Sequence, residues 1–319
     1  MKKVTVVIPN YNGIEYIDKC MSHLVKQDYR DFNVIVVDNG STDLSREAAL
    51  KYKDVMDVTV VELGENYGFS RGVNEGIARA DSEYVILLNN DAYAGKRFIG
   101  ELVHKMDSDD NIFSAQALML QYRNRELTDS AGDYFSAMGW GFARGRDKKA
   151  SDYKKDREVF SCCAGAAIYR KSVFGEIGMF DEAFFAYLED MDMGYRARLA
   201  GYINVFVPSA KVLHVGSGFS GSRHNAFKVS LSARNSFLVM YKNFAPWQWL
   251  VNMPFIMAGV CIKTAYFARK KLAGAYFKGV FGFFSQKKNV TKTKAADSTV
   301  YRKIQKELLS NCFLRLENL

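Results

Sequence analysis

Residues 84–88 form an unbroken apolar run that stops abruptly at Asn89, Asn90 and Asp91. A run of this length, rich in Val, Ile and Leu, predicts a strand that is buried on both faces, as in a parallel sheet. The carboxyl end of such a strand opens on the crevice where open α/β sheets bind ligands. Two amides and one carboxylate at that point offer hard oxygen ligands to a divalent cation and to the phosphates it carries. An isolated Asn-Asn-Asp turn has a simpler structural explanation, so the interpretation depends on the other strand ends.

Three further strand patterns rich in Val and Ile precede this one, at residues 4–8, 32–37 and 58–63, and helix-like patterns separate them. Alternating strands and helices of this length predict an α/β fold with a doubly wound, mostly parallel sheet. The carboxyl ends of parallel strands share one edge, so the polar residues that follow each run should converge on a single cleft. Those residues are Asn10 and Asn12, Asp38 and Asp43, Asn66 and Asn74, and Asn89 and Asp91.

Two common phosphate-binding fingerprints are absent. No Gly-x-Gly-x-x-Gly follows the first strand, and the chain contains no Gly-x-x-x-x-Gly-Lys-Ser/Thr. A dinucleotide-binding turn and a P-loop are therefore both excluded. If the cleft binds phosphate, a bound cation is the simplest way to hold it.

The second half of this region carries further candidate residues. Residues 112–120 predict another strand, and the charged, glycine-containing stretch 121–158 predicts a mobile loop region over the cleft. Residues 160–170 return to a strand pattern, and the small residues Ala164 and Gly165 allow a ligand to approach the backbone closely.

Glu189, Asp190 and Asp192 stand where an aromatic stretch gives way to a helix that should close at Gly201. Acidic residues in a first helical turn are favoured by the helix dipole, which is the plain structural explanation. Carboxylates crowded beside aromatic residues also have at least one raised pKa, and this makes a usable general base.

His214 ends a predicted strand at 205–214 and precedes the glycine-rich residues 216–221. A single histidine is more often structural than a metal ligand. Its place at a strand end raises the metal-ligand interpretation until the two are about equally supported. Both interpretations stay open at this point.

The net charge of +9 is unevenly distributed along the 319 residues. Residues 1–240 hold 30 Lys and Arg against 32 Asp and Glu, whereas residues 241–319 hold 14 against 3, a balance of +11. Five cysteines without metal-type spacing fit a reducing cytosolic compartment. We expect no signal peptide, because Lys2 and Lys3 lead directly into a strand pattern.

The basic C-terminal part has two possible interpretations. Residues 247–262 are apolar but interrupted by Gln248, Asn252 and Pro254, so we expect no membrane span, which needs about 20 apolar residues. Cationic and aromatic residues alternate over 269–288, which predicts a surface lying on anionic lipid headgroups. The alternative is a helical cap with a solvated basic face. Nucleic acid is not an expected partner, because these residues follow no known module.

Taken together, six stretches resemble glycosyltransferase family 2, inverting enzymes with the nucleotide-sugar-binding GT-A fold. These are residues 6–12, 36–43, 65–76, 87–91 and 188–192 together with His214, and the resemblance covers about residues 3–222. Within the family, the chain is most similar to the bacterial rhamnosyltransferase-like branch, which builds cell-surface polysaccharide.

The resemblance implies a role for each matched position. On the donor side it assigns the base, ribose and diphosphate contacts to Pro9, Asn10, Tyr11, Asn12, Asp38, Asn66, Gly68, Asn74, Asn89 and Asn90. It makes Asp91 and His214 ligands of Mg²⁺ or Mn²⁺, and Asp190, beside Glu189, the general base. It places Ala164, Gly165 and Asp192 on the acceptor side. Asn89 stands where the family has the first Asp of Asp-x-Asp, and its lack of charge weakens the expected metal site.

The implied function is metal-dependent, inverting transfer of one sugar, such as rhamnose, from a nucleoside diphosphate to a hydroxyl acceptor. A Gln-x-x-Arg-Trp motif of processive synthases is missing, which favours single-sugar transfer. The implied layout is a catalytic domain at 1–235, with a nucleotide-sugar half to about 120 and an acceptor half from 121, followed by a basic helical region at 236–319. We expect a lipid-linked acceptor and a peripheral position on the inner face of the cytoplasmic membrane. A non-catalytic nucleotide-sugar-binding scaffold is the alternative that Asn89 keeps open.

Overall fold

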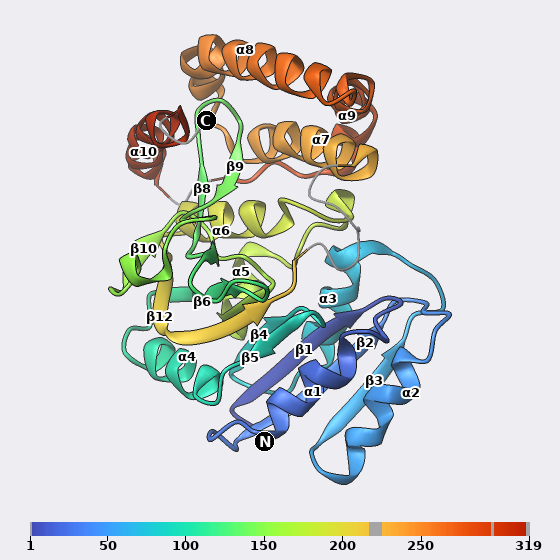
Figure 1. Ribbon diagram of the computed structural model, residues 1–319. Helices are drawn as coiled ribbons and strands as arrows, with labels where there is room; N and C mark the ends of the chain where they lie inside the picture. The colour runs from blue at the N-terminus through green and yellow to red at the C-terminus, as the bar shows by residue number, and fades with distance from the viewer. Residues whose placement is uncertain (1, 217–224, 295–296, 317–319) are drawn as a thin grey trace.

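The computed structural model describes residues 2–216, 225–294 and 297–316 and is shown in Figure 1. Its first part contains β1 (Val4–Asn10), α1 (Ile17–Val25), β2 (Phe32–Asp38), α2 (Ser45–Leu50), β3 (Val58–Glu62), α3 (Gly68–Arg79), β4 (Tyr84–Leu88), β5 (Ala92–Ala94), α4 (Phe98–Asp107) and β6 (Ile112–Gln121). The middle part contains β7 (Thr128–Ser130), β8 (Asp133–Phe135), β9 (Gly141–Ala143), β10 (Arg157–Val159), β11 (Ala166–Arg170), α5 (Phe174–Ile177), α6 (Glu189–Leu199) and β12 (Ile203–His214). The last part contains α7 (Ala226–Asn243), α8 (Pro246–Arg269), α9 (Ala273–Gln286) and α10 (Ser298–Leu316).

One large twisted sheet passes through the first two parts in the strand order β10-β12-β6-β11-β4-β1-β2-β3. The strands β4, β1, β2 and β3 are parallel, as the sequence predicts. β11 then lies antiparallel between β4 and β6, and β12 is parallel to β6. The sheet is therefore purely parallel from β4 to β3 and mixed beyond β4.

Each central strand is buried on both faces, which explains the unbroken apolar runs in the sequence. Ile8 of β1 points into a core shared with Ile17 and Leu24 of α1. Its neighbour Val7 points into a second core on the opposite face, together with Ile77 of α3. Alternate residues of a strand face opposite sides, so a strand between two helical layers must be apolar at every position.

The stretch 121–158 is not the irregular loop that its sequence predicts. It contains the strands β7 to β10, and its residues Phe135 and Trp140 are buried against the C-terminal helices. Gly139, with a φ of +72°, makes the turn between β8 and β9. These strands are three residues long, too short to show an apolar period, which is why the prediction is wrong.

α8 is a single continuous helix of 24 residues, although the sequence predicts an interrupted segment. Pro254 lies inside it, and the two polar interruptions face the protein. Gln248 and Asn252 are fully buried, and their side chains bond to Gln305 of α10 at 2.9 and 3.1 Å. The polar residues therefore form an internal amide cluster and do not break the apolar outer surface of α8.

Among the described residues, α8 is the one helix whose length and composition would allow it to cross a membrane. Its best window has a mean hydropathy of 1.4, and 17% of that window is buried inside the protein. Two of the three interruptions on which the sequence prediction of no span was based, Gln248 and Asn252, are thus absent from its exposed side, whereas Pro254 is exposed.

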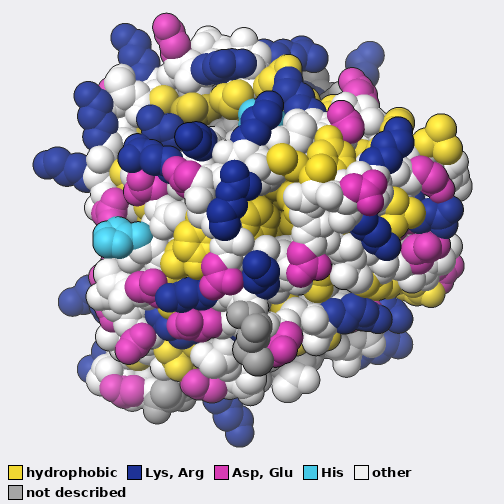
Figure 2. All heavy atoms as spheres, turned by 90° about the horizontal axis from the view of Figure 1, so that it is seen from below, with side chains coloured by type: hydrophobic (Ala, Val, Ile, Leu, Met, Phe, Trp, Pro, Cys, Tyr) yellow, Lys and Arg dark blue, Asp and Glu magenta, His cyan; other side chains and the backbone are white. Residues whose placement is uncertain are grey.

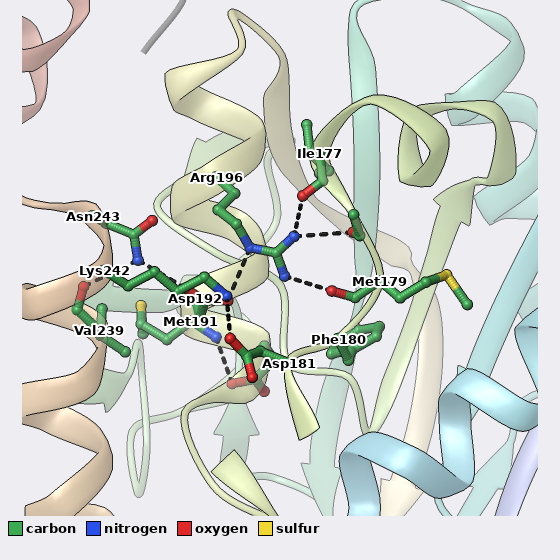
Figure 3. A network of polar contacts seen from close by, with 12 residues as sticks. Ile177, Met179, Phe180, Asp181, Met191, Asp192, Arg196, Val239, Lys242 and Asn243 are labelled. Carbon is green, nitrogen blue, oxygen red and sulfur yellow. Dashed lines mark hydrogen bonds and ion pairs between the residues drawn. The ribbon is translucent and has the colours of Figure 1, made fainter. Parts of the chain in front are cut away.

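A buried ionic network attaches α7 to α6 and is shown in Figure 3. The carboxylate of Asp192 in α6 accepts hydrogen bonds from Arg196 at 2.9 Å, Lys242 at 3.0 Å and Asn243 at 2.8 Å. Lys242 also donates to Asp181 at 2.6 Å. Arg196 uses its remaining hydrogens on the backbone carbonyls of residues 177–179. One buried carboxylate thereby joins α6, α7 and the segment before the site.

We expect Asp192→Ala to lower the free energy of unfolding by about 3–5 kcal/mol, because it leaves the buried Arg196 without its carboxylate and Lys242 with Asp181 alone. Burial alone would raise the pKa of Asp192, but Arg196 and Lys242 lower it. A carboxyl whose pKa is lowered by folding stabilises the protein above its unfolded pKa of about 3.9 and loses that contribution as the pH falls below it. Urea unfolding of the full chain at pH 7 and at pH 4 and below measures both effects.

The matched control is Glu62→Gln, which removes an ion pair to Arg46 whose side chains are 59% and 40% exposed. Exposed pairs contribute about 0–1 kcal/mol, so this variant should unfold nearly as the wild type does. An equal effect of the two substitutions would contradict the structural role of Asp192.

Candidate active site

The carboxyl ends of β1, β2 and β4 meet at one edge of the sheet. Asn10 pairs in register with Asp38, and its side-chain amide donates to that carboxylate at 3.0 Å. The amide of Asn90 donates to the Asn10 oxygen at 2.8 Å, which adds the end of β4 to the cluster. The structure thus brings together polar residues from three strand ends, and both Asn10 and Asp38 are almost fully buried.

Asn39 joins the next loop to this cluster, and the sequence reasoning missed it. Its amide nitrogen donates to the Asn66 oxygen at 3.1 Å and to the Gly68 carbonyl at 3.0 Å, and its own oxygen accepts from the Tyr67 amide at 3.0 Å. Gly68 has a φ of +86°, and a Cβ there would lie 2.5 Å from the Phe185 carbonyl. The position of Asn39 directly after Asp38 at a strand end is the signal that could have identified it.

The remaining donor-side predictions have different surroundings. Pro9 and Tyr11 are half-buried, while Asn12 is exposed and its side chain accepts from the Thr42 amide at 2.8 Å. Asn74 is not directed at the cluster, because both ends of its side-chain amide bond to the backbone of Phe180, at 2.7 and 3.0 Å. Its observed contacts hold α3 to the segment before α6.

Asp91 and His214 lie side by side at the end of β4 and β12. The Nε2 atom of His214 is 3.2 Å from an Asp91 carboxylate oxygen, and its Nδ1 atom is 2.8 Å from Asp129, which also pairs with Arg146 at 3.1 Å. Burial alone would lower the pKa of His214, but its hydrogen bonds to Asp129 and Asp91 raise it to about 10. Asp129 belongs to β7, in the stretch that the sequence predicts as loop, so nothing in its local pattern indicates this contact.

This arrangement fits a divalent cation. A cation that took the place of the Nε2 proton of His214 would meet the Nε2 lone pair beside Asp91 while Nδ1–H donates to Asp129. A carboxylate on the far nitrogen is the usual orienting partner of a metal-binding histidine. The Nε2 atom and the Asp91 oxygen, which are 3.2 Å apart, are the two atoms that would hold such a cation.

Asp190 lies in the first turn of α6, next to the backbone of Ala164. The Ala164 amide donates to one carboxylate oxygen at 3.2 Å, and the Met191 amide donates to the other at 2.8 Å. The carbonyl of Gly165 in turn accepts a hydrogen bond from the backbone amide of Asn89 at 3.0 Å. Residues 164 and 165 therefore connect the carboxylate of Asp190 to the strand end that carries Asp91.

Two further acids and a thiol surround Asp190. A carboxylate oxygen of Asp133, the Cys163 sulfur and an Asp190 oxygen all lie within 4.8 Å of one another. Burial raises the pKa of Asp190, while the hydrogen bonds from Ala164 and Met191 lower it. Burial and the neighbouring charge of Asp190 raise the pKa of both Asp133 and Glu189 well above their usual range.

Glu189 and Asp192 occupy the interior. The Oε2 atom of Glu189 is buried and has no hydrogen-bond partner among the residues that the structure describes. Asp192 is completely buried and bonded to Arg196, Lys242 and Asn243, which leaves no surface on which an acceptor could contact it.

Comparisons with curated proteins and with solved structures find glycosyltransferases among the similar proteins. The N-acetylglucosaminyl-diphospho-decaprenol L-rhamnosyltransferase of Mycobacterium tuberculosis is 24% identical over 279 residues, which cover 80% of this chain and 89% of that protein. The mannosyltransferase PcManGT from Pyrobaculum calidifontis, in complex with GDP-Man and Mn²⁺, gives a TM-score of 0.55 at 17% identity and covers 90% of this chain and 84% of its own. GalNAc-T7 with UDP, GalNAc and Mn²⁺ gives a TM-score of 0.61 at 17% identity over 76% of this chain and 48% of its own.

The likeness to the two solved structures confirms the predicted GT-A fold, and a family model confirms the resemblance in the sequence. The model of glycosyl transferase family 2 matches residues 5–178, which is more than half of the chain. The match begins in β1 and includes all the strand ends that build the polar cluster. This chain belongs to glycosyl transferase family 2 and is a glycosyltransferase.

Proposed function

We propose that the enzyme transfers one sugar from a nucleoside diphosphate to a hydroxyl of a lipid-linked acceptor, with inversion at the anomeric carbon. The observation that carries the proposal is the link between two polar centres through Ala164 and Gly165. One centre holds Asp190, and the other holds Asp91 and His214. This arrangement suits a direct displacement at the anomeric carbon, because the base and the site for the diphosphate lie at opposite ends of the bridge formed by Ala164 and Gly165.

Asp190 takes the proton in this proposal. Its carboxylate accepts the proton of the acceptor hydroxyl while that oxygen bonds to the anomeric carbon, and the bond from this carbon to the diphosphate breaks with its electron pair going to the diphosphate. A carboxyl in a buried site is a stronger base than in water, and the raised pKa of Asp190 supports this assignment. Burial and the charge of Asp190 raise the pKa of the neighbouring Asp133 well above its usual range.

Asp91 and His214 are the residues that would hold a divalent cation, and Asp129 would orient the histidine. When bound, such a cation offsets the negative charge that grows on the departing diphosphate. A carboxylate oxygen such as that of Asp91 suits both Mg²⁺ and Mn²⁺, and both solved structures described above contain Mn²⁺.

The sugar and nucleotide are open to a direct test. The full chain would be titrated with UDP-N-acetylglucosamine, dTDP-L-rhamnose and GDP-mannose, each with and without Mn²⁺. L-Rhamnose is the first choice, because the relative with high coverage on both chains is named a rhamnosyltransferase. Saturable binding of one donor followed by release of its nucleoside diphosphate supports the proposal, and binding of none contradicts it.

We expect Asp190→Asn to abolish release of the nucleoside diphosphate while changing the Kd of the donor less than twofold, because Asp190 acts on the acceptor. The wild-type rate should fall as the pH drops below the raised pKa of Asp190, since the base must be ionised. Asp133→Asn is the matched control, with the same chemical change within 4.8 Å, and it should retain most of the rate. Loss of donor binding in the Asp190 variant would remove this residue from the role of base.

We expect Asp91→Asn to weaken Mn²⁺ binding, and Asp129→Asn to weaken it by about 10–100-fold, as the loss of an orienting carboxylate does at other metal sites. Mn²⁺ titration of the full chain, followed by the electron paramagnetic resonance of the free ion, measures the affinity without requiring activity. Cys163→Ala is the control, because it removes a ligand from the other cluster of possible metal ligands. If Cys163→Ala alone lowered the affinity, the cation would belong to that cluster.

The C-terminal helices supply the argument for a lipid surface. The outer sides of α8 and α9 expose a row of large apolar residues, namely Trp247, Leu250, Val251, Met253, Met257, Phe277, Phe281 and Phe284. The basic residues 269–271, 278, 287 and 288 lie in the same helices and their ends. At the opposite end of the molecule, basic and acidic side chains are intermixed (Figure 2). We propose that this outer side of α8 and α9 lies on the anionic cytoplasmic face of a membrane; all five cysteines are free thiols, which suits that compartment.

We expect the full chain to sediment with anionic vesicles and to be partly released by salt, since each Lys or Arg near the surface contributes about 1 kcal/mol that screening reduces. Leu250→Gln combined with Phe281→Gln should weaken the binding further. Leu44→Gln is the matched control, because Leu44 is 69% exposed and lies before α2, outside the C-terminal helices. Equal binding of all three proteins would leave α8 and α9 as a structural cap.

A further inference from the structure

The backbone just before Glu189 and Asp190 has an unusual conformation. Phe185, Tyr187 and Leu188 have φ angles of 63°, 70° and 67°, although none of them is glycine. Side chains other than glycine avoid this region, and they remain there only when the surrounding structure holds them. Contacts with the rest of the protein therefore hold this turn, residues 183–188, in its conformation.

Two adjacent side chains of α7 bond to the carbonyls of the turn. Asn235, which is completely buried, donates from its amide nitrogen to the carbonyls of Phe184, Ala186 and Tyr187 at 3.0, 2.9 and 2.7 Å. Arg234 donates to the carbonyls of Ala183 and Phe184 at 3.0 and 2.8 Å. Arg234 also donates to the Asn235 side-chain oxygen at 2.9 Å, which fixes the amide with its nitrogen toward the turn.

The amino end of α3 holds the turn from the other side. The backbone amides of Phe69 and Ser70 donate to the Phe185 carbonyl at 2.6 and 3.2 Å. All the carbonyls of residues 183–187 thus accept hydrogen bonds from α3 or α7. These contacts explain how the three left-handed residues are kept in place.

The turn determines where α6 begins. The Leu188 carbonyl accepts from the Asp192 amide at 3.0 Å, which is the first helical hydrogen bond, and Asp190 lies within that first turn. Near its other end, α7 bonds to Asp181 and Asp192 through Lys242 and to Asp192 through Asn243. α7 therefore runs along the segment 181–192 and is attached to both of its ends.

We propose that Asn235, oriented by Arg234, is a positioning residue for Asp190. By holding the carbonyls of the turn, it sets the direction in which α6 starts and hence the place of the carboxylate relative to the acceptor hydroxyl. This inference rests on the proposed function, since it takes Asp190 as the base. Neither Asn235 nor Arg234 touches the reacting atoms. Because both residues belong to α7, the positioning role makes the C-terminal helices part of the catalytic apparatus.

The test is Asn235→Asp in the full chain, which keeps the shape of the side chain but replaces its N–H donors with an oxygen facing three carbonyls. A shift of the base by about 1 Å lowers a rate by about 100-fold. We expect kcat for nucleoside diphosphate release to fall by about that factor, using whichever of UDP-N-acetylglucosamine, dTDP-L-rhamnose and GDP-mannose the wild type turns over. The Kd of that donor should change less than twofold, and amide hydrogen exchange should accelerate at residues 185–191.

Ser236→Ala is the matched control, because the Ser236 hydroxyl bonds only within α7, to the Ser232 carbonyl, among the contacts that the structure describes for it. It should retain the wild-type kcat. A parallel loss of kcat and donor affinity in Asn235→Asp would indicate general damage to the fold and would overturn the proposal, as would a wild-type kcat.

Two further variants keep the outcomes distinct. If Asn235→Asp does not fold, Arg234→Lys takes its place, since it keeps the charge but loses the two-carbonyl fork. It should lower kcat by about tenfold at unchanged donor Kd, and a wild-type kcat overturns the inference. Asp190→Asn distinguishes a failure of the positioning role from a failure of the proposed function. If this variant is inactive while the variants at 234 and 235 turn over normally, the proposed function stands and the positioning role is refuted. If Asp190→Asn is active, the proposed base is refuted first.

Discussion

The buried carboxylate of Asp192 is the interaction on which the arrangement of the site depends. A charge without exposed surface requires partners, and Asp192 obtains them from its own helix and from α7. Arg196, which pairs with it, is itself satisfied by the carbonyls of residues 177–179. Each partner thereby fixes a different segment, and the result is a rigid frame around the turn that precedes Asp190. Such a network is costly when incomplete, so it tolerates only one relative placement of these segments.

The same frame explains how neighbouring acids in one helix come to differ. Asp192 has cations within hydrogen-bond distance, and its pKa is lowered. Glu189 has none there, and burial together with the charge of Asp190 raises its pKa. Asp190 lies between these extremes, because backbone amides partly offset its burial. Asp190 and Asp192 have the same side chain, so the difference between their pKa values follows from the direction in which each points around the first turn of α6.

The sequence predicts the parallel half of the fold closely, because strands buried on both faces leave long apolar runs that end at polar residues. It also identifies Asp91, Asp190 and His214, which stand at the ends of strands or at the start of a helix. It does not reveal Asp129, which belongs to a three-residue strand and meets His214 across 85 positions. It does not reveal Asn235, whose partners are backbone carbonyls about 50 residues away and carry no sequence signal. Gln248 and Asn252 mislead for a similar reason, because their polar partner Gln305 lies in another helix.

α7 belongs to two parts of the molecule at once. One side of it bonds to the turn before Asp190, while Val229 and Ala233 on the other pack with Tyr276 of α9 and the nearby Val260 of α8. Equilibria that act on a shared rigid element are coupled, and the coupling is equal in both directions. If a surface in contact with α8 and α9 raises the ligand affinity of the site by some factor, a bound ligand raises the affinity for that surface by the same factor. If the membrane proposed for this surface strengthens binding at the site, the enzyme would hold that membrane most tightly while it is occupied, and release of product would loosen the attachment.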